Sequence, residues 1–200
     1  MQPFTVLKAP AIPFPTPNID TDQIIPARYL GLTRAQQVEG LFRDARSNED
    51  GRPRPDFPLN QAAYKGARIV VAARNFACGS SREHAVTALL DNGFSAFIAP
   101  SFGDIFNNNC YQNGCLPIVL PQARVDELLR FLLELPGAEI AIDLEQQTVI
   151  GPDGQTDGFD IDPFRKECLL KGLDDVDLTL AYAPQIAAFE ARQKAETSWL

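Results

Sequence analysis

A short apolar run, a connection rich in small polar residues and then a helix are the features that most constrain this fold. Residues 67–73 are continuous, apolar and largely β-branched, which is typical of a strand buried on both faces. Residues 82–92 carry apolar side chains at helical spacing, followed by a glycine placed for a C-terminal cap. Further strands are predicted at 94–99 and 116–120, with a short helical turn over 104–109 between them. This order favours right-handed crossovers and a largely parallel sheet.

The N-terminal flank predicts one more strand and a long exposed connection. Residues 4–12 form a strand candidate that Pro13 is expected to break. Residues 43–58 are charged and proline-containing, which is typical of an exposed loop. Asn107, Asn108 and Asn109 are expected in a polar loop that lines a cleft.

The C-terminal flank predicts helices and a hairpin. An amphipathic helix is expected over 123–135, then a hairpin of strands 139–144 and 147–150. Two more helices are expected near 163–171 and 184–194. The prediction for the whole is an α/β fold with a mixed, partly parallel sheet flanked by helices, and one domain, residues 1–200, accommodates it.

Composition excludes several classes of protein. The 200 residues include 45% hydrophobic and 22% charged residues, which is ordinary for a globular chain. The net charge of −8 argues against a general nucleic-acid or membrane-surface binder. No apolar run reaches the roughly 18 residues of a membrane span, and the proline-rich residues 1–17 do not resemble a signal peptide. The four cysteines, Cys78, Cys110, Cys115 and Cys168, show no CxxC spacing, so we expect a cytoplasmic chain with no metal site of its own.

The acidity is unevenly distributed. Residues 1–120 contain 11 basic and 10 acidic residues, a net charge of +1. Residues 121–200 contain 7 basic and 16 acidic residues, a net charge of −9. The first part of the chain therefore carries no surplus of negative charge that would repel an anionic substrate.

The candidate site is the stretch from Asn75 to His84, which reads Asn-Phe-Ala-Cys-Gly-Ser-Ser-Arg-Glu-His. It lies between a predicted buried strand and a helix start, where free backbone N–H groups and the helix dipole favour anions. Arg82 adds a planar fork suited to a carboxylate or phosphate. A Ser80 alkoxide would be stabilised there, so Ser80 is a candidate base or nucleophile.

Other interpretations of these residues are open. Ser80 to Glu83 also form a capping box, S-x-x-E, which merely starts a helix. Ser80 and His84 could belong to a serine hydrolase, although no G-x-S-x-G elbow is present. Upstream, Asp20 and Asp22 fit a turn or helix cap as well as a site.

Several segments together resemble one family. They are residues 75–85 with the Cys-Gly-Ser-Ser-Arg-Glu-His core, 98–106 (Ile-Ala-Pro-Ser-Phe-x-Asp-Ile-Phe), 18–26 with Asp-Thr-Asp, and 162–174 near the end. Taken in chain order, they resemble the small subunit of 3-isopropylmalate dehydratase. The resemblance covers nearly the whole chain and implies the swivelling β/β/α domain of the aconitase superfamily.

The resemblance also implies a function and a partner. It implies half of a hydro-lyase that converts 2-isopropylmalate to 3-isopropylmalate through isopropylmaleate in leucine biosynthesis. A separate large subunit would carry the [4Fe-4S] cluster, with no cofactor on this chain. By the matched motif Ser80 would be the base, Ser81 and Arg82 would hold a substrate carboxylate, and Asp22 would line the cleft. A base strong enough to take a carbon-bound proton needs such an oxyanion-stabilising environment.

Two departures and one loop leave questions open. Glycine is usual in the family where Ala77 stands, and Ala-Pro-Trp-Ala often follows the histidine where this chain has Ala-Val-Thr-Ala at 85–88. The segment 28–34 resembles the superfamily's specificity loop. Its Tyr29, Leu30 and Leu32 suit an apolar group, whereas its Arg28 and Arg34 suit a third carboxylate.

That loop leaves methylmalate- or homoaconitate-type substrates open. A stand-alone serine hydrolase and a non-catalytic metabolite-binding or assembly module are the competing functional classes. A self-associated isolated chain is also possible, because a surface made for a partner is exposed without it.

Overall fold

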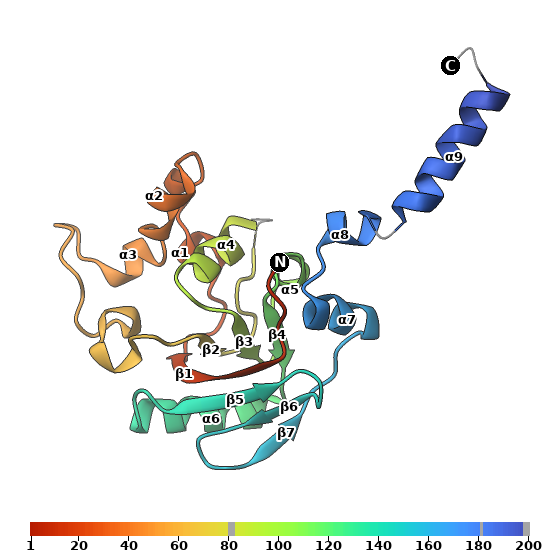
Figure 1. The fold of residues 1–200 in the computed structure, drawn as a ribbon. Helices are drawn as coiled ribbons and strands as arrows, with labels where there is room; N and C mark the ends of the chain where they lie inside the picture. The colour runs from red at the N-terminus through yellow and green to blue at the C-terminus, as the bar shows by residue number, and fades with distance from the viewer. Residues whose placement is uncertain (80–82, 181, 198–200) are drawn as a thin grey trace.

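The computed structural model describes residues 1–79, 83–180 and 182–197. Within these residues seven strands form one sheet in the order β4-β3-β2-β1-β5-β6-β7 (Figure 1). The parallel half pairs β1 with β2, β2 with β3 and β3 with β4, and the antiparallel half pairs β1 with β5, β5 with β6 and β6 with β7. The strands are β1 (Val6–Phe14), β2 (Ile69–Ala72), β3 (Ala96–Ala99), β4 (Leu116–Val119), β5 (Glu139–Asp143), β6 (Thr148–Ile150) and β7 (Thr156–Gly158). The predicted mixed α/β fold is confirmed.

Strand β1 joins the two halves and corrects the expectation that Pro13 breaks it. Its first part pairs with β5 as far as the Pro10–Glu139 pair, and its second part pairs with β2 from Ala11 onward. The Ala11 N–H points toward the β5 side, where it donates to the Ala138 carbonyl at 3.0 Å. The backbone nitrogen of Pro13, two residues further along, faces the same side, but it lies beyond the last β1–β5 residue pair. The N–H group that proline lacks would therefore have had no partner in β5, and no hydrogen bond of the sheet is lost.

Helices cover both faces of the sheet. They are α1 (Thr21–Ile24), α2 (Arg34–Val38), α3 (Arg43–Arg46), α4 (Glu83–Asp91), α5 (Asp104–Gln112), α6 (Gln122–Glu134), α7 (Pro163–Lys171), α8 (Asp175–Leu180) and α9 (Ala183–Glu196), with 3-10 turns η1 (Ala27–Tyr29), η2 (Pro58–Asn60) and η3 (Ala62–Tyr64). Helix α9 stands away from the sheet in Figure 1, and none of its side chains is buried. No helix in the described part of the chain is long and apolar enough to cross a membrane.

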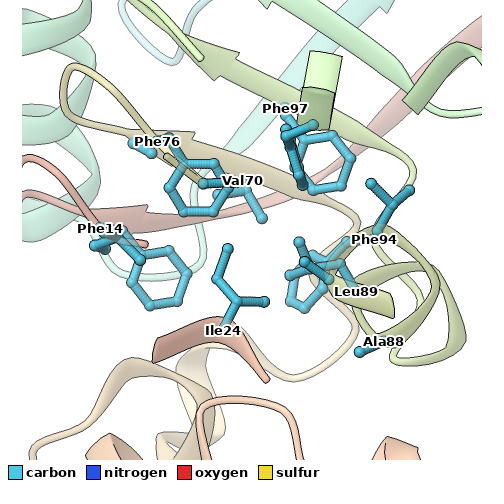
Figure 2. Packing of buried hydrophobic residues seen from close by; sticks show 14 of the residues in the cluster. Phe14, Ile24, Val70, Phe76, Ala88, Leu89, Phe94 and Phe97 are labelled. Atoms are coloured by element: carbon cyan, nitrogen blue, oxygen red, sulfur yellow. The ribbon is translucent and has the colours of Figure 1, made fainter. Parts of the chain in front are cut away.

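Alternation along the strands divides the core into two clusters. In β2, Val70 belongs to one cluster and its neighbours Ile69 and Val71 to the other, so the clusters lie on opposite faces. Figure 2 shows the first, where Phe14, Phe76 and Phe97 pack with Ile24 of α1 and Leu89 of α4. The second lies under α6, through Val125, Leu128, Leu129 and Leu132. The first cluster therefore fixes α1 and α4 on one face of the sheet, and the second fixes α6 on the other.

Several element predictions need correction. The turn expected at 104–109 is the nine-residue helix α5, because Phe106 and Cys110, one turn apart, are both buried and anchor it. Asn107, Asn108 and Asn109 are therefore helical and do not form the expected loop. The expected loop 43–58 begins with the short helix α3. The hairpin 139–150 is confirmed, and strand β7 and helix α8 had no counterpart in the prediction.

Candidate functional site

Ser80, Ser81 and Arg82 lie outside the described residues, so the site is built from what surrounds them. The segments 18–22, 75–79 and 101–104 follow β1, β2 and β3 respectively. Because these strands are parallel neighbours, their carboxyl ends share one edge of the sheet. The structure thus brings three of the motif segments together at the edge where ligands bind in open parallel sheets.

Backbone hydrogen bonds join the three segments. The Thr21 N–H donates to the Cys78 carbonyl at 2.9 Å, and the Cys78 N–H donates to the Ile19 carbonyl at 3.3 Å. On the other side, the Phe76 N–H donates to the Ser101 carbonyl at 3.1 Å, and the Gly103 N–H donates to the Phe76 carbonyl at 2.9 Å. Residues 75–79 are therefore held between the N-terminal segment and the segment after β3.

Three of the residues in 75–79 have a positive backbone φ angle. Asn75 and Ala77 have φ of 59° and 55°, and Gly79 has φ of 98°. Alternate residues are thus left-handed, a conformation that glycine and asparagine tolerate and alanine adopts at a cost. A glycine at position 77 would adopt this geometry without strain.

A cavity of about 320 Å³ opens at this edge of the sheet. Its lining comes from all three segments and from the first turn of α5. The lining residues are Thr21, Asn75, Ala77, Cys78, Gly79, Phe102, Gly103, Asp104, Ile105 and Phe106. Sequence reasoning gave no role to Phe102 and Gly103, and the available signal was their position directly after a predicted strand.

The two acids of the N-terminal motif differ in their surroundings. Asp20 caps α1: its carboxylate accepts the Gln23 N–H at 2.8 Å, and Gln23 Oε1 accepts the Asp20 N–H at 3.0 Å. The helix-cap interpretation is therefore confirmed for Asp20. Asp22 lies exposed in the first turn of α1, next to Thr21, which lines the cavity.

Both arginines of the segment 28–34 are held by acids of this chain. Arg28 binds both carboxylate oxygens of Asp44, with Nη1 donating to Oδ2 at 2.9 Å. Arg34 binds Asp91 through Nε and Nη2, each at 2.7 Å. The hydrogen bond from Arg28 lowers the pKa of Asp44 below its usual range. These guanidinium groups are thus neutralised within the chain in this structure.

The apolar residues of that segment lie at different depths. Tyr29 and Leu30 are half-buried against the first core cluster, whereas Leu32 is 42% exposed. The buried Gln37 donates from Nε2 to the Leu30 and Leu32 carbonyls at 3.3 and 3.0 Å. Leu32 is therefore the apolar side chain that this segment presents to its surroundings.

The cysteines and His84 are the remaining candidate residues. The four cysteines are free thiols, and burial raises the pKa of Cys115 to about 12. Within the described ranges no group of three or more His, Cys, Asp or Glu could hold a metal ion. His84 is half-buried in the first turn of α4, and its carbonyl accepts a hydrogen bond from Thr87 Oγ1 at 3.3 Å.

A mixed sheet whose parallel half carries this cavity defines a domain of the aconitase C-terminal class, and the family model described as "Aconitase C-terminal domain" matches residues 1–123. The LeuD_N model matches residues 126–163, and the model for the C-terminal domain of the 3-isopropylmalate dehydratase small subunit matches residues 175–200. The chain belongs to the 3-isopropylmalate dehydratase small subunit family.

Individual relatives agree with this family. The small subunit of Rhodospirillum centenum is 50% identical over 200 residues, which cover all of this chain and 98% of the relative. That of Xanthobacter autotrophicus is 51% identical over 201 residues and covers both chains completely. The crystal structure of 3-isopropylmalate dehydratase from Methanocaldococcus jannaschii superimposes with a TM-score of 0.64 at 27% identity, covering 94% of this chain and 99% of that one.

Proposed function

We propose that this chain is the small subunit of a two-chain iron–sulfur hydro-lyase of leucine biosynthesis. It would act with a large subunit to isomerise 2-isopropylmalate to 3-isopropylmalate by dehydration and rehydration. The observation that carries the proposal is the convergence of segments 18–22, 75–79 and 101–104 around one cavity at the carboxyl edge of the parallel strands. The names of full-length relatives at about 50% identity support the activity.

Within this proposal Ser80 is the base that removes the carbon-bound proton. It directly follows Gly79, which lines the cavity, and it directly precedes the segment that enters α4. Ser81 and Arg82 hold a substrate carboxylate, and Asp22 supports the site electrostatically. A [4Fe-4S] cluster, which the large subunit would carry, would supply the Lewis-acid iron for the substrate hydroxyl and carboxylate. Residues 1–120, with a net charge of +1, do not repel a dicarboxylate.

The ion pairs of Arg28 and Arg34 favour a substrate that carries an apolar group. A third carboxylate in place of the isopropyl group would need a free cation, whereas Arg28 and Arg34 already bind Asp44 and Asp91. The exposed Leu32 offers an apolar contact instead. We therefore assign isopropylmalate in preference to homoaconitate-type substrates.

Two further assignments belong to the same proposal. The free cysteines suit the reducing cytoplasm, where we place the chain. We also regard residues 1–200 as one domain, because strand β1 is shared by the parallel and antiparallel halves of the sheet.

The test is a substitution of the base in the complex reconstituted with a cluster-bearing large subunit. Ser80→Ala should lower the rate of isomerisation by roughly 10²- to 10⁴-fold, the range for general acid–base catalysis, while the complex still forms. Arg82→Lys should raise the apparent KM, because lysine loses the bidentate fork. A Ser80→Ala complex with the wild-type rate removes Ser80 from the mechanism.

A further inference from the structure

Hydrogen bonds to Asn75, five residues before Ser80 in the sequence, join the three segments of the candidate site. Asn75 Nδ2 donates to Asn18 Oδ1 at 2.9 Å, and the Asn75 backbone N–H donates to Ser101 Oγ at 2.9 Å. The three residues belong to the three segments that follow β1, β2 and β3. Asn75 itself lines the 320 Å³ cavity.

The backbone at this point needs such support. Asn18 and Asn75 are both left-handed, with φ of 57° and 59°, and Ala77 follows with φ of 55°. A conformation of this kind persists only where surrounding contacts determine it. The Asn18 N–H also donates to the Arg74 carbonyl at 3.0 Å, and the Ser101 carbonyl accepts the Phe76 N–H at 3.1 Å. Asn18 therefore binds residues 74 and 75, and Ser101 binds residues 75 and 76.

We propose that Ser101 and Asn18 are positioning residues for the base: by holding Asn75 they fix the backbone of residues 75–79, the segment that directly precedes Ser80 in the sequence. This inference rests on the proposed function, since it assigns a purpose to the geometry of residues 75–79, which precede the proposed base in the sequence. A misplacement of a reacting group by about 1 Å costs roughly 10²-fold in rate. The side-chain oxygens of residues 18 and 101 are thus expected to affect turnover more than substrate binding.

The test measures kcat and KM of the reconstituted complex with Ser101→Ala and Ser101→Thr. Ser101→Ala removes the acceptor of the Asn75 N–H, and we expect kcat to fall roughly 10- to 100-fold with KM little changed. Ser101→Thr keeps an oxygen acceptor, and Ser101 is exposed, so the added methyl group has room. The threonine variant should recover most of kcat.

A second variant protects the test against misfolding. Asn18→Gly removes Oδ1 but allows the left-handed backbone, so it should lower kcat in the same way without backbone strain. An unchanged kcat in Ser101→Ala and Asn18→Gly overturns the proposal. A kcat that falls only in step with Tm or with complex formation also overturns it, as does a threonine variant as impaired as the alanine variant.

The positioning role and the proposed function fail in different ways. If only the positioning role is wrong, Ser80→Ala is impaired whereas Ser101→Ala is not. If Ser80 is not the base, Ser80→Ala retains the wild-type rate. If the proposed function is wrong, the wild-type complex shows no turnover.

Discussion

Gly103 lies so close to the backbone of Ala77 that a Cβ atom at position 103 would stand 2.5 Å from the Ala77 carbonyl oxygen. Gly103 has φ of −62°, so contact rather than conformation requires glycine there. Gly103→Ala should lower the free energy of unfolding by about 1–3 kcal/mol, because the two segments of the site must move apart. Urea unfolding measures the change.

Gly31→Ala is the matched control for that substitution. A Cβ atom at Gly31 would meet nothing within 4 Å, so the free energy of unfolding should stay within about 0.5 kcal/mol of wild type. Equal effects at positions 31 and 103 would contradict the close approach of the two segments.

At Ala77 the replacement of alanine by glycine is predicted to stabilise the fold. Its left-handed conformation costs an L-residue roughly 1–2 kcal/mol, whereas glycine adopts it freely and loses about 0.5–1 kcal/mol in backbone entropy. Ala77→Gly should therefore raise the free energy of unfolding by about 0.5–1 kcal/mol. The exposed helical Ala123→Gly is the control and should lower it by up to about 1 kcal/mol. Destabilisation by Ala77→Gly would refute the left-handed assignment.

Local elements were more predictable from the sequence than contacts between distant segments. The strand predicted at 67–73 is observed at Ile69–Ala72, and the helix predicted at 82–92 is observed at Glu83–Asp91. Both were predictable because their own apolar spacing determines them. Strand β1 beyond Pro13 was not, because its continuation depends on where β5 stops pairing. The motif around Ser80 was likewise readable in the sequence. The approach of Gly103 to Ala77 was not, since it depends on β2 and β3 being parallel neighbours.

A buried arginine stabilises the antiparallel half. Arg124 of α6 is 6% exposed, binds both oxygens of Asp153 at 2.7 and 3.0 Å, and binds Asp157 at 2.7 Å. Arg124→Met leaves these acids without their cation and should lower the free energy of unfolding by about 3–5 kcal/mol. The exposed Arg130→Met in the same helix is the control and should change it by less than about 1 kcal/mol.

The same ion pair predicts a pH dependence. Hydrogen bonding from Arg124 lowers the pKa of Asp153 below its ordinary value of 3.8 in the folded state. The stabilisation is therefore present above that value and is lost as the pH falls through the lower folded-state pKa. Acid titration of unfolding should show wild type losing more stability below about pH 4 than Arg124→Met loses. Parallel curves would contradict this role for Arg124.

The paired arginines of the segment 28–34 predict a change in specificity. Asp44→Asn and Asp91→Asn together remove the carboxylate partners of Arg28 and Arg34. In the reconstituted complex we compare kcat/KM for an analogue with a carboxylate in place of the isopropyl group with kcat/KM for 2-isopropylmalate. The ratio of the two should rise by up to about fivefold, because that is the range of free energy of an exposed ion pair. The control is Asp56→Asn in the neighbouring loop. A ratio equal to that of the wild-type complex would show that these ion pairs do not influence substrate specificity.

The most direct test of the central claim is the turnover of 2-isopropylmalate by this chain alone, by a cluster-bearing large subunit alone, and by their mixture. Formation of isopropylmaleate, followed by its absorbance, reports the rate. We predict no turnover by either chain alone and steady turnover by the mixture. Hydrolase activity of this chain alone that is lost in Ser80→Ala, with no turnover by the mixture, would contradict the proposed function.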